Sequence, residues 1–220
     1  QNLRIAENQN REIKDKSYFF SSLCLTLVRG QNEGMRKTVV DDHIRKAAKN
    51  YRYLHFPLNS YEDKDEEYGN HWTLAVLDTE EEVWRHYNSM RPTQGEDPYL
   101  KDAYDMKNYF ETYLKKAQNS SGTTFSNMLT KDAALLSIEE SPQQEDGTLD
   151  CGIVVCYVMH QIAHQEGFDA FFSVKNTRWI RKELIHTFLR DPTRSWDEKE
   201  CIERKKLSDL YGTNNNASNL

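Results

Sequence analysis

The chain has 220 residues, of which 37% are hydrophobic and 29% are charged, and its net charge at pH 7 is −6. This length and composition predict one soluble globular domain with a sizeable core. The acidic balance argues against nucleic acid as a partner. No apolar run approaches the roughly 20 residues that span a bilayer, so we expect no membrane partner.

The four cysteines are irregularly spaced, and no CxxC pair occurs. This spacing predicts no structural zinc site, and His160 and His164 have no evident third ligand. The N-terminal stretch has neither the apolar centre of a signal peptide nor the character of a transit peptide. We therefore expect free thiols in a reducing compartment, the nucleus or the cytoplasm, and no metal or organic cofactor.

Periodicity and turn residues predict the elements of the first half of the chain. The apolar block at 17–30 is expected to be a buried helix, with a strand as the alternative. A helix is expected at 38–51, where acids come early and bases late. Strands are expected at 52–59, 71–78 and 81–90, and the second of them, HWTLAVLD, is apolar enough to be covered on both faces.

The second half is predicted to be mostly helical. A helix at 100–118 would bury Leu100, Tyr104, Tyr109 and Leu114, and a strand is expected at 132–140. An apolar helix from Cys151 to Glu166, with Cys156 in its core register, would end at Gly167. A last helix at 176–190 would bury the side chains at its apolar positions. These are Trp179, Ile180, Leu184 and Phe188. Helices, then strands, then helices around one core indicate an α+β fold.

Residues 141–156 read SPQQEDGTLDCGIVVC, so a polar, turn-rich run meets an apolar helix at Cys151. A thiol attacks well only as a thiolate, and the N-terminus of a helix lowers its pKa. Asp150 can cap this helix, and Gly152 leaves the thiol unobstructed. The alternative for Cys151 is a small buried residue at a helix start.

A nucleophilic cysteine also needs a base that a third polar group holds in place. His71 opens the expected central strand, and Asn88 follows the next strand, so neighbouring strands can bring the two side chains together. Gln143 or Gln144 can supply an oxyanion donor upstream of the thiol. Taken singly, His71 can be a satisfied polar residue, Asn88 a turn former and Trp72 a core aromatic.

The ordered segments FPLN, HWTLAVLD, HYNSM, PQQ and DCGIVVC, between Phe56 and Cys156, resemble the ubiquitin-like-protein-specific cysteine proteases of the Ulp/SENP type. The family pattern is a PIN strand, HW with an apolar strand, YDS, and PQQxNxxDCG at the start of the central helix. The resemblance implies a papain-like α+β fold, with a central mixed sheet flanked by helices and the nucleophile at the N-terminus of a central helix. It also implies one protease domain over 1–210, and the low-complexity stretch 211–220 is expected to be a disordered tail.

The resemblance assigns roles to individual residues. Cys151 would be the nucleophile, His71 the general base and acid, and Gln144 the oxyanion donor. Trp72 would form the wall of a narrow tunnel that only a diglycine tail can thread. Gln143, Asp150 and Gly152 are expected to border the same substrate site.

The chain departs from the family pattern at several points. Asn88 stands where the family has aspartate, and an asparagine can orient an imidazole but adds no charge. The run from the glutamines to Cys151 is one residue longer than usual, which leaves Gln143 and Gln144 as alternatives. No WLND-like segment is found near the N-terminus, and an acidic insertion at 60–70 precedes His71.

The expected function is cleavage after the C-terminal diglycine of a ubiquitin-like modifier, with SUMO as the commonest substrate of the family. The modifier and its conjugates are the expected partners. Two alternatives keep the same residues. One is acyl transfer from the same Cys/His site, and the other is a weakly active or inactive module that binds a ubiquitin-like protein. Asn88 is the residue that keeps the second alternative open.

Overall fold

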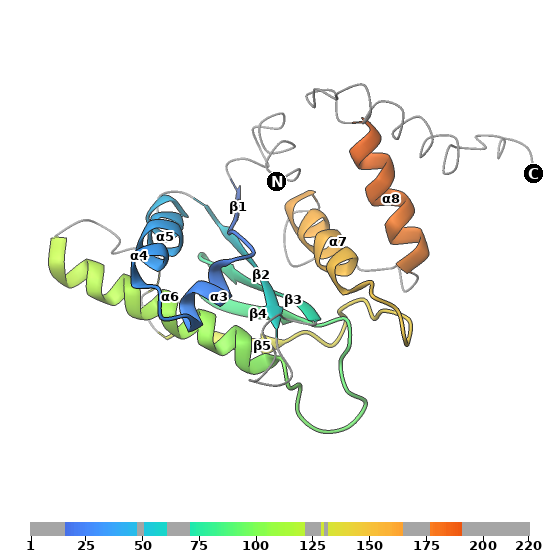
Figure 1. The fold of residues 1–220 in the computed structure, drawn as a ribbon, viewed down its shortest axis with the longest axis horizontal. Coiled ribbons are helices and arrows are strands. Elements are labelled where there is room, and N and C mark those ends of the chain that lie inside the picture. Colours follow the sequence, from blue (N-terminus) through green and yellow to red (C-terminus); the bar gives the residue numbers. More distant parts are fainter. Residues whose placement is uncertain are drawn as a thin grey trace, which may run out of the picture.

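The computed structural model describes residues 16–47, 51–60, 71–121, 129, 132–164 and 177–190 (Figure 1). They form one five-stranded sheet with helices on both faces, which confirms the α+β class. The strands are β1 (Ser17–Phe19), β2 (Tyr53–Ser60), β3 (His71–Asp78), β4 (Val83–Tyr87) and β5 (Ala134–Ser137). The helices are α3 (Cys24–Arg29), α4 (Glu33–Arg36), the π-helical η1 (Lys37–Asp41), α5 (Asp42–Ala47), α6 (Leu100–Ser121), α7 (Cys151–His164) and α8 (Thr177–Arg190).

The sheet is mixed and keeps the order of the sequence, β1-β2-β3-β4-β5. The three inner strands are antiparallel to one another, whereas β1 and β5 pair in parallel with their neighbours. β2 runs through Pro57 to Ser60, one residue beyond the predicted end of the strand at 59. Proline lacks an N–H for a ladder bond. It is tolerated here because β1 pairs with β2 only as far as His55.

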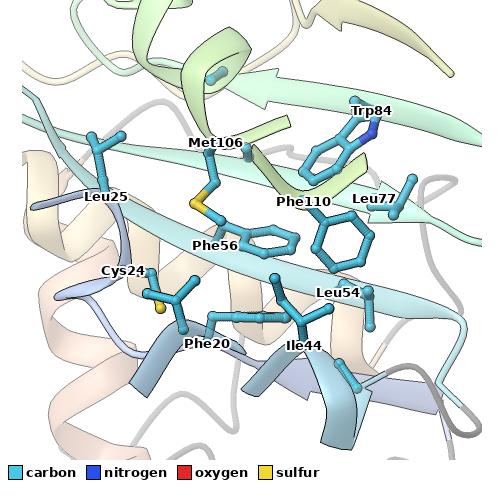
Figure 2. Close-up of a cluster of buried hydrophobic side chains, with 14 of the residues drawn as sticks. Phe20, Cys24, Leu25, Ile44, Leu54, Phe56, Leu77, Trp84, Met106 and Phe110 are labelled. Atoms are coloured by element: carbon cyan, nitrogen blue, oxygen red, sulfur yellow. The ribbon is translucent and has the colours of Figure 1, made fainter. Parts of the chain in front are cut away.

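Each face of the sheet carries its own hydrophobic cluster. Along β3, Ala75 and Leu77 face the cluster beneath α3, α5 and α6, whereas Leu74 and Val76 face α7 and α8. This alternation is the period of two that a strand imposes. Aromatic rings fill the centre of the first cluster (Figure 2): Phe20, Phe56, Trp84 and Phe110. The prediction that β3 is covered on both faces is confirmed, and β3 is therefore a firmly held support for the residue at its start.

The apolar block at 17–30 is not one helix. Residues 17–19 form β1, which pairs with β2, and the helix α3 begins only at Cys24. The sequence gives no sign of this division, because both halves are apolar and their partners lie far along the chain.

The buried faces of three helices also differ from the prediction. α6 buries Ala103, Met106, Phe110 and Leu114, and the predicted Tyr104 is 44% exposed. Trp179 of α8 is 45% exposed and lies edge-on to Tyr157, whereas Ile180 is buried as predicted. Cys156 of α7 is exposed rather than in the core. In each helix, the residue predicted to be buried lies next to the buried face and not on it.

Several predictions fall outside the described residues: the acidic loop at 61–70, the helix end at Gly167, the side chain of Phe188, and the domain boundary and tail beyond 210. They stay predictions. Within the described ranges, no helix combines the length and apolar character that crossing a membrane requires.

Candidate active site

His71 and Asn88 meet at one edge of the sheet. His71 is the first residue of β3, and Asn88 directly follows β4, the antiparallel neighbour of β3. The Nε2 atom of His71 lies 2.8 Å from Oδ1 of Asn88, and the two residues are 1% and 2% exposed. The prediction that neighbouring strands bring this pair together is confirmed.

Cys151 is the first residue of α7 and is buried beside His71. Burial raises the pKa of its thiol, but the His71 side chain and the backbone N–H groups of Trp72 and Gly152 outweigh burial and lower that pKa below its ordinary value. An N–H at the start of a helix has no partner within the helix and is free to stabilise a thiolate. Cys151 therefore lies in a setting that favours its nucleophilic form.

The hydrogen bond from His71 to Asn88 fixes which ring nitrogen is available for chemistry. The amide oxygen of Asn88 accepts, so Nε2 of His71 donates and Nδ1 carries the lone pair. Among the described residues, this buried Nδ1 has no hydrogen-bond partner within ordinary limits. Contacts between a nucleophile and its base are often loose without substrate and tighten when substrate binds.

The loop after β4 holds Asn88 from two sides. The backbone N–H of Met90 donates to Oδ1 of Asn88 at 2.8 Å, and Nδ2 of Asn88 donates to Oδ1 of Asp97 at 3.0 Å. Burial raises the pKa of Asp97, but the nearby His86 side chain and the hydrogen bond from Asn88 outweigh burial and lower this pKa. Sequence reasoning missed Asp97, because an aspartate before Pro98 in a turn-rich run is typical of an ordinary turn.

Gln143 ties the loop that carries Asn88 to the segment before Cys151. Its Nε2 donates to the carbonyl oxygens of Asn88 at 2.8 Å and of Ser141 at 2.9 Å, and its Oε1 accepts from the backbone N–H of Arg91 at 3.0 Å. Both N–H bonds of this amide are therefore engaged. Gln143 has the contacts of a residue that positions the loop.

Gln144 is held more loosely. Its Oε1 accepts from Oγ of Ser89 at 3.0 Å, and its Nε2 donates to the carbonyl oxygen of Thr148 at 2.7 Å. A primary amide has two N–H donors. Because one bond from Nε2 is found among the described residues, Gln144 can offer its second N–H to another acceptor.

Trp72 and Gly152 lie against each other beside Cys151. A Cβ atom placed on Gly152 would come 3.7 Å from Cδ1 of Trp72, which is ordinary van der Waals contact. A methyl group at position 152 would therefore touch the indole without a clash. Trp72 is half-buried, and its backbone N–H, like that of Gly152, lies against the thiol of Cys151.

Asp150 stands at the N-terminus of α7, where its carbonyl oxygen accepts from the N–H of Val154 at 3.0 Å. Its carboxylate, however, binds the guanidinium of Arg181 in α8, with Nε at 2.9 Å. Burial raises the pKa of Asp150, but hydrogen bonds from Thr177 and Arg181 lower it overall. The carboxylate thus ties α7 to α8, and direct contact with substrate stays a prediction.

Within the part of the chain that the structure describes, no group of three or more His, Cys, Asp or Glu side chains is arranged to hold a metal ion.

Comparison with known proteins identifies the family. The model of the Ulp1 protease family, C-terminal catalytic domain, matches residues 7–191. No curated protein matches the chain significantly. The chain is similar to the catalytic domain of a Ulp1-like SUMO protease from Chaetomium thermophilum, with 12% identity and a TM-score of 0.53 over 90% of this chain and 69% of that one.

Other solved structures are similar as well. The yeast Ulp1 protease domain in complex with SMT3 has 20% identity and a TM-score of 0.46, and the match covers 80% of this chain and 69% of that one. XopD of Xanthomonas campestris, bound to ubiquitin, has 14% identity and a TM-score of 0.48 over 94% of this chain and 85% of that one. Since the family model spans most of the sequence, the chain belongs to the Ulp1 protease family and is a cysteine peptidase with the fold of that family's catalytic domain.

Proposed function

We propose that this peptidase cleaves after the C-terminal diglycine of a ubiquitin-like modifier and that SUMO is its modifier. The observation that carries the proposal is the pair of His71 and Asn88, joined at 2.8 Å beside a thiol of lowered pKa. A Cys-His-Asn set of this kind serves papain-like proteases. Cys151 is the nucleophile, His71 the base and acid, and Asn88 the residue that orients His71.

The reaction takes two steps. The Cys151 thiolate adds to the carbonyl carbon of the terminal glycine, and protonated His71 gives its proton to the leaving nitrogen as the C–N bond breaks. That nitrogen is a lysine ε-amine in a conjugate or a peptide nitrogen in a precursor. Water then attacks the thioester while His71 takes its proton, and the C–S bond breaks to release the carboxylate and restore the thiolate.

Gln144 is the proposed oxyanion donor. Among the described residues, its amide donates only to Thr148 and so keeps a second N–H, whereas both N–H groups of the Gln143 amide are engaged. The backbone N–H groups at the start of α7 add to this donor. An oxyanion donor of this type contributes about 10²- to 10³-fold to kcat.

Selectivity for diglycine is assigned to Trp72, whose indole lies against Gly152 next to Cys151. In this proposal the indole forms one wall of the path that the modifier's tail takes to the thiol. A tail of two glycines has no Cβ atoms and can pass close to such a wall. SUMO is the first choice because the Chaetomium relative that shares the fold is a SUMO protease.

A panel of vinyl-sulfone probes made from SUMO, the neddylation modifier and ubiquitin tests the proposal. The SUMO probe should label the wild type at one site and fail to label Cys151→Ser. Cys156→Ser is the matched control, because Cys156 lies in the same helix and is exposed, and it should be labelled like the wild type. If no probe labels Cys151, the chain is a binding module or an acyltransferase. Labelling by another modifier alone would refute SUMO as the substrate.

A further inference from the structure

A buried carboxylate lies directly behind Asn88. The side chain of Asp97, in the loop between β4 and α6, is 5% exposed, and its Oδ1 accepts a hydrogen bond from Nδ2 of Asn88 at 3.0 Å. Oδ1 of the same asparagine lies 2.8 Å from Nε2 of His71. Three side chains thus form a continuous series from His71 through Asn88 to Asp97, and Cys151 lies at its other end.

Asp97 helps to determine which way the amide of Asn88 points. An ionised carboxylate can only accept hydrogen bonds, so the amide nitrogen must face it. The N–H of Met90 points at Oδ1 of Asn88 and favours the same orientation. With Oδ1 turned towards His71, Nε2 must donate, and Nδ1 is left to take the proton of the thiol. Asp97 therefore fixes the tautomer of His71 through an intervening residue.

Asp97 also supplies a negative charge that Asn88 lacks. Attack by Cys151 requires a thiolate beside an imidazolium, and a nearby carboxylate stabilises the cation. His86 of β4 also lies near Asp97, with its Nδ1 at 3.5 Å from Oδ2 of Asp97. Tyr99 is a further titratable group against this series, and its ring centroid lies 4.5 Å from that of His71.

We infer that Asp97 is a positioning residue of the active site, which holds Asn88 in its working orientation and supplies through it the negative charge for protonated His71. The inference rests on the proposed roles of Cys151, His71 and Asn88. In this arrangement the acid contacts Asn88 instead of His71, and Asn88 transmits the effect of the acid to the imidazole.

Asp97 also has a structural contact that the test must separate from this role. Its Oδ1 accepts from the N–H of Tyr99 at 2.9 Å, and its carbonyl oxygen accepts from the N–H of Leu100 at 3.1 Å, where α6 begins. Asparagine serves in such a turn as well as aspartate does. Asp97→Asn therefore keeps the turn and removes only the charge, which makes it the informative variant.

The first measurement is hydrolysis of a SUMO substrate with a C-terminal fluorogenic amide. Asp97→Asn should lower kcat about 10- to 50-fold, since a charge two hydrogen bonds from the imidazolium is lost. KM and the thermal midpoint should stay at their wild-type values. Glu96→Gln is the matched control, because it removes an exposed charge from the neighbouring position, and it should keep the wild-type kcat.

The second measurement is rescue. Asn88→Asp combined with Asp97→Asn moves the single carboxylate into direct contact with His71, so the double variant should recover most of the activity that Asp97→Asn loses. Asn88→Asp alone places two carboxylates about 3 Å apart, and such a pair takes up a proton, so this single variant should be less active than the double variant.

A third measurement needs no modifier. The rate at which iodoacetamide alkylates Cys151 near pH 6 reports the thiolate that His71 supports. Asp97→Asn should slow it, and the double variant should restore it. Wild-type kcat and alkylation in Asp97→Asn, or a double variant no better than Asp97→Asn, would overturn the inference. If the wild type cleaves no modifier, the proposed function fails, whereas the alkylation series still decides the role of Asp97.

Discussion

Replacing each of the two adjacent glutamines by methionine should separate the oxyanion donor from the residue that holds the loop. Methionine matches glutamine in length but removes its amide. Gln143→Met loses three hydrogen bonds: to Asn88 at 2.8 Å, to Ser141 at 2.9 Å and to Arg91 at 3.0 Å. At about 1 kcal/mol for each, the free energy of unfolding should fall by about 2–3 kcal/mol. Because two of these bonds hold the loop of Asn88, we expect kcat to fall only a few-fold.

Gln144→Met should have the opposite profile. It loses bonds to Ser89 and Thr148, which lowers the free energy of unfolding by about 1–2 kcal/mol. If its second N–H binds the oxyanion, kcat should fall about 10²- to 10³-fold, which corresponds to about 2.7–4 kcal/mol of transition-state stabilisation. KM should change little, because the contact forms only in the transition state.

The assay combines kcat and KM on a SUMO fluorogenic amide with urea unfolding of the same samples. Gln94→Met, at an exposed position of the loop between β4 and α6, is the control and should match the wild type in both. An equal or larger fall in kcat for Gln143→Met, or wild-type kcat for Gln144→Met, would show that Gln144 is not the donor.

Three further predictions concern single side chains. Cys151→Ser should abolish turnover but keep its affinity for the modifier by titration calorimetry, and turnover near the wild-type rate would contradict its role. Phe110→Ala should lower the free energy of unfolding by about 3–5 kcal/mol in urea titrations, since its ring lies 5.6 Å from those of Phe56 and Trp84; a loss below 1 kcal/mol would contradict this packing. Burial lowers the pKa of His55 to about 3, below its ordinary 6.5. Between these two pH values, the unfolded chain therefore binds a proton at His55 that the folded protein does not bind. The free energy of unfolding should fall as pH drops from about 6.5 towards 3, by roughly 5 kcal/mol over the whole range. The free energy of unfolding of His55→Phe should depend less steeply on pH, and an equal pH dependence in both proteins would show that His55 is not the cause.

Local patterns in the sequence were sufficient for most of the fold. The nearly continuous apolar run HWTLAVLD predicted a central strand, and β3 spans those residues. The polar run that meets an apolar segment at Cys151 predicted a helix start, and α7 begins there. Such signals arise from neighbours along the chain, which the sequence displays directly.

The meeting of His71 and Asn88 was also predictable, because antiparallel neighbouring strands bring the start of one beside the end of the next.

The apolar block at 17–30 was not divided correctly into a strand and a helix. Its division depends on β2, which pairs with Ser17 to Phe19 from more than thirty positions away. Propensity within the block does not carry that information.

The sequence by itself determined the class of fold and the family resemblance that the comparison confirmed, and it predicted which residues serve as nucleophile and base. Only the tertiary structure decided that Gln143 holds the loop, that Asp150 binds Arg181 and that Asp97 lies behind Asn88. The physical reason is the range of these contacts. The glutamine bond to Asn88 spans 55 positions and the Asp150 pair 31, so their geometry exists only once the sheet and helices have packed. Asp97 is nine positions from Asn88, yet a loop of irregular conformation connects them, and no periodicity predicts where its side chains meet.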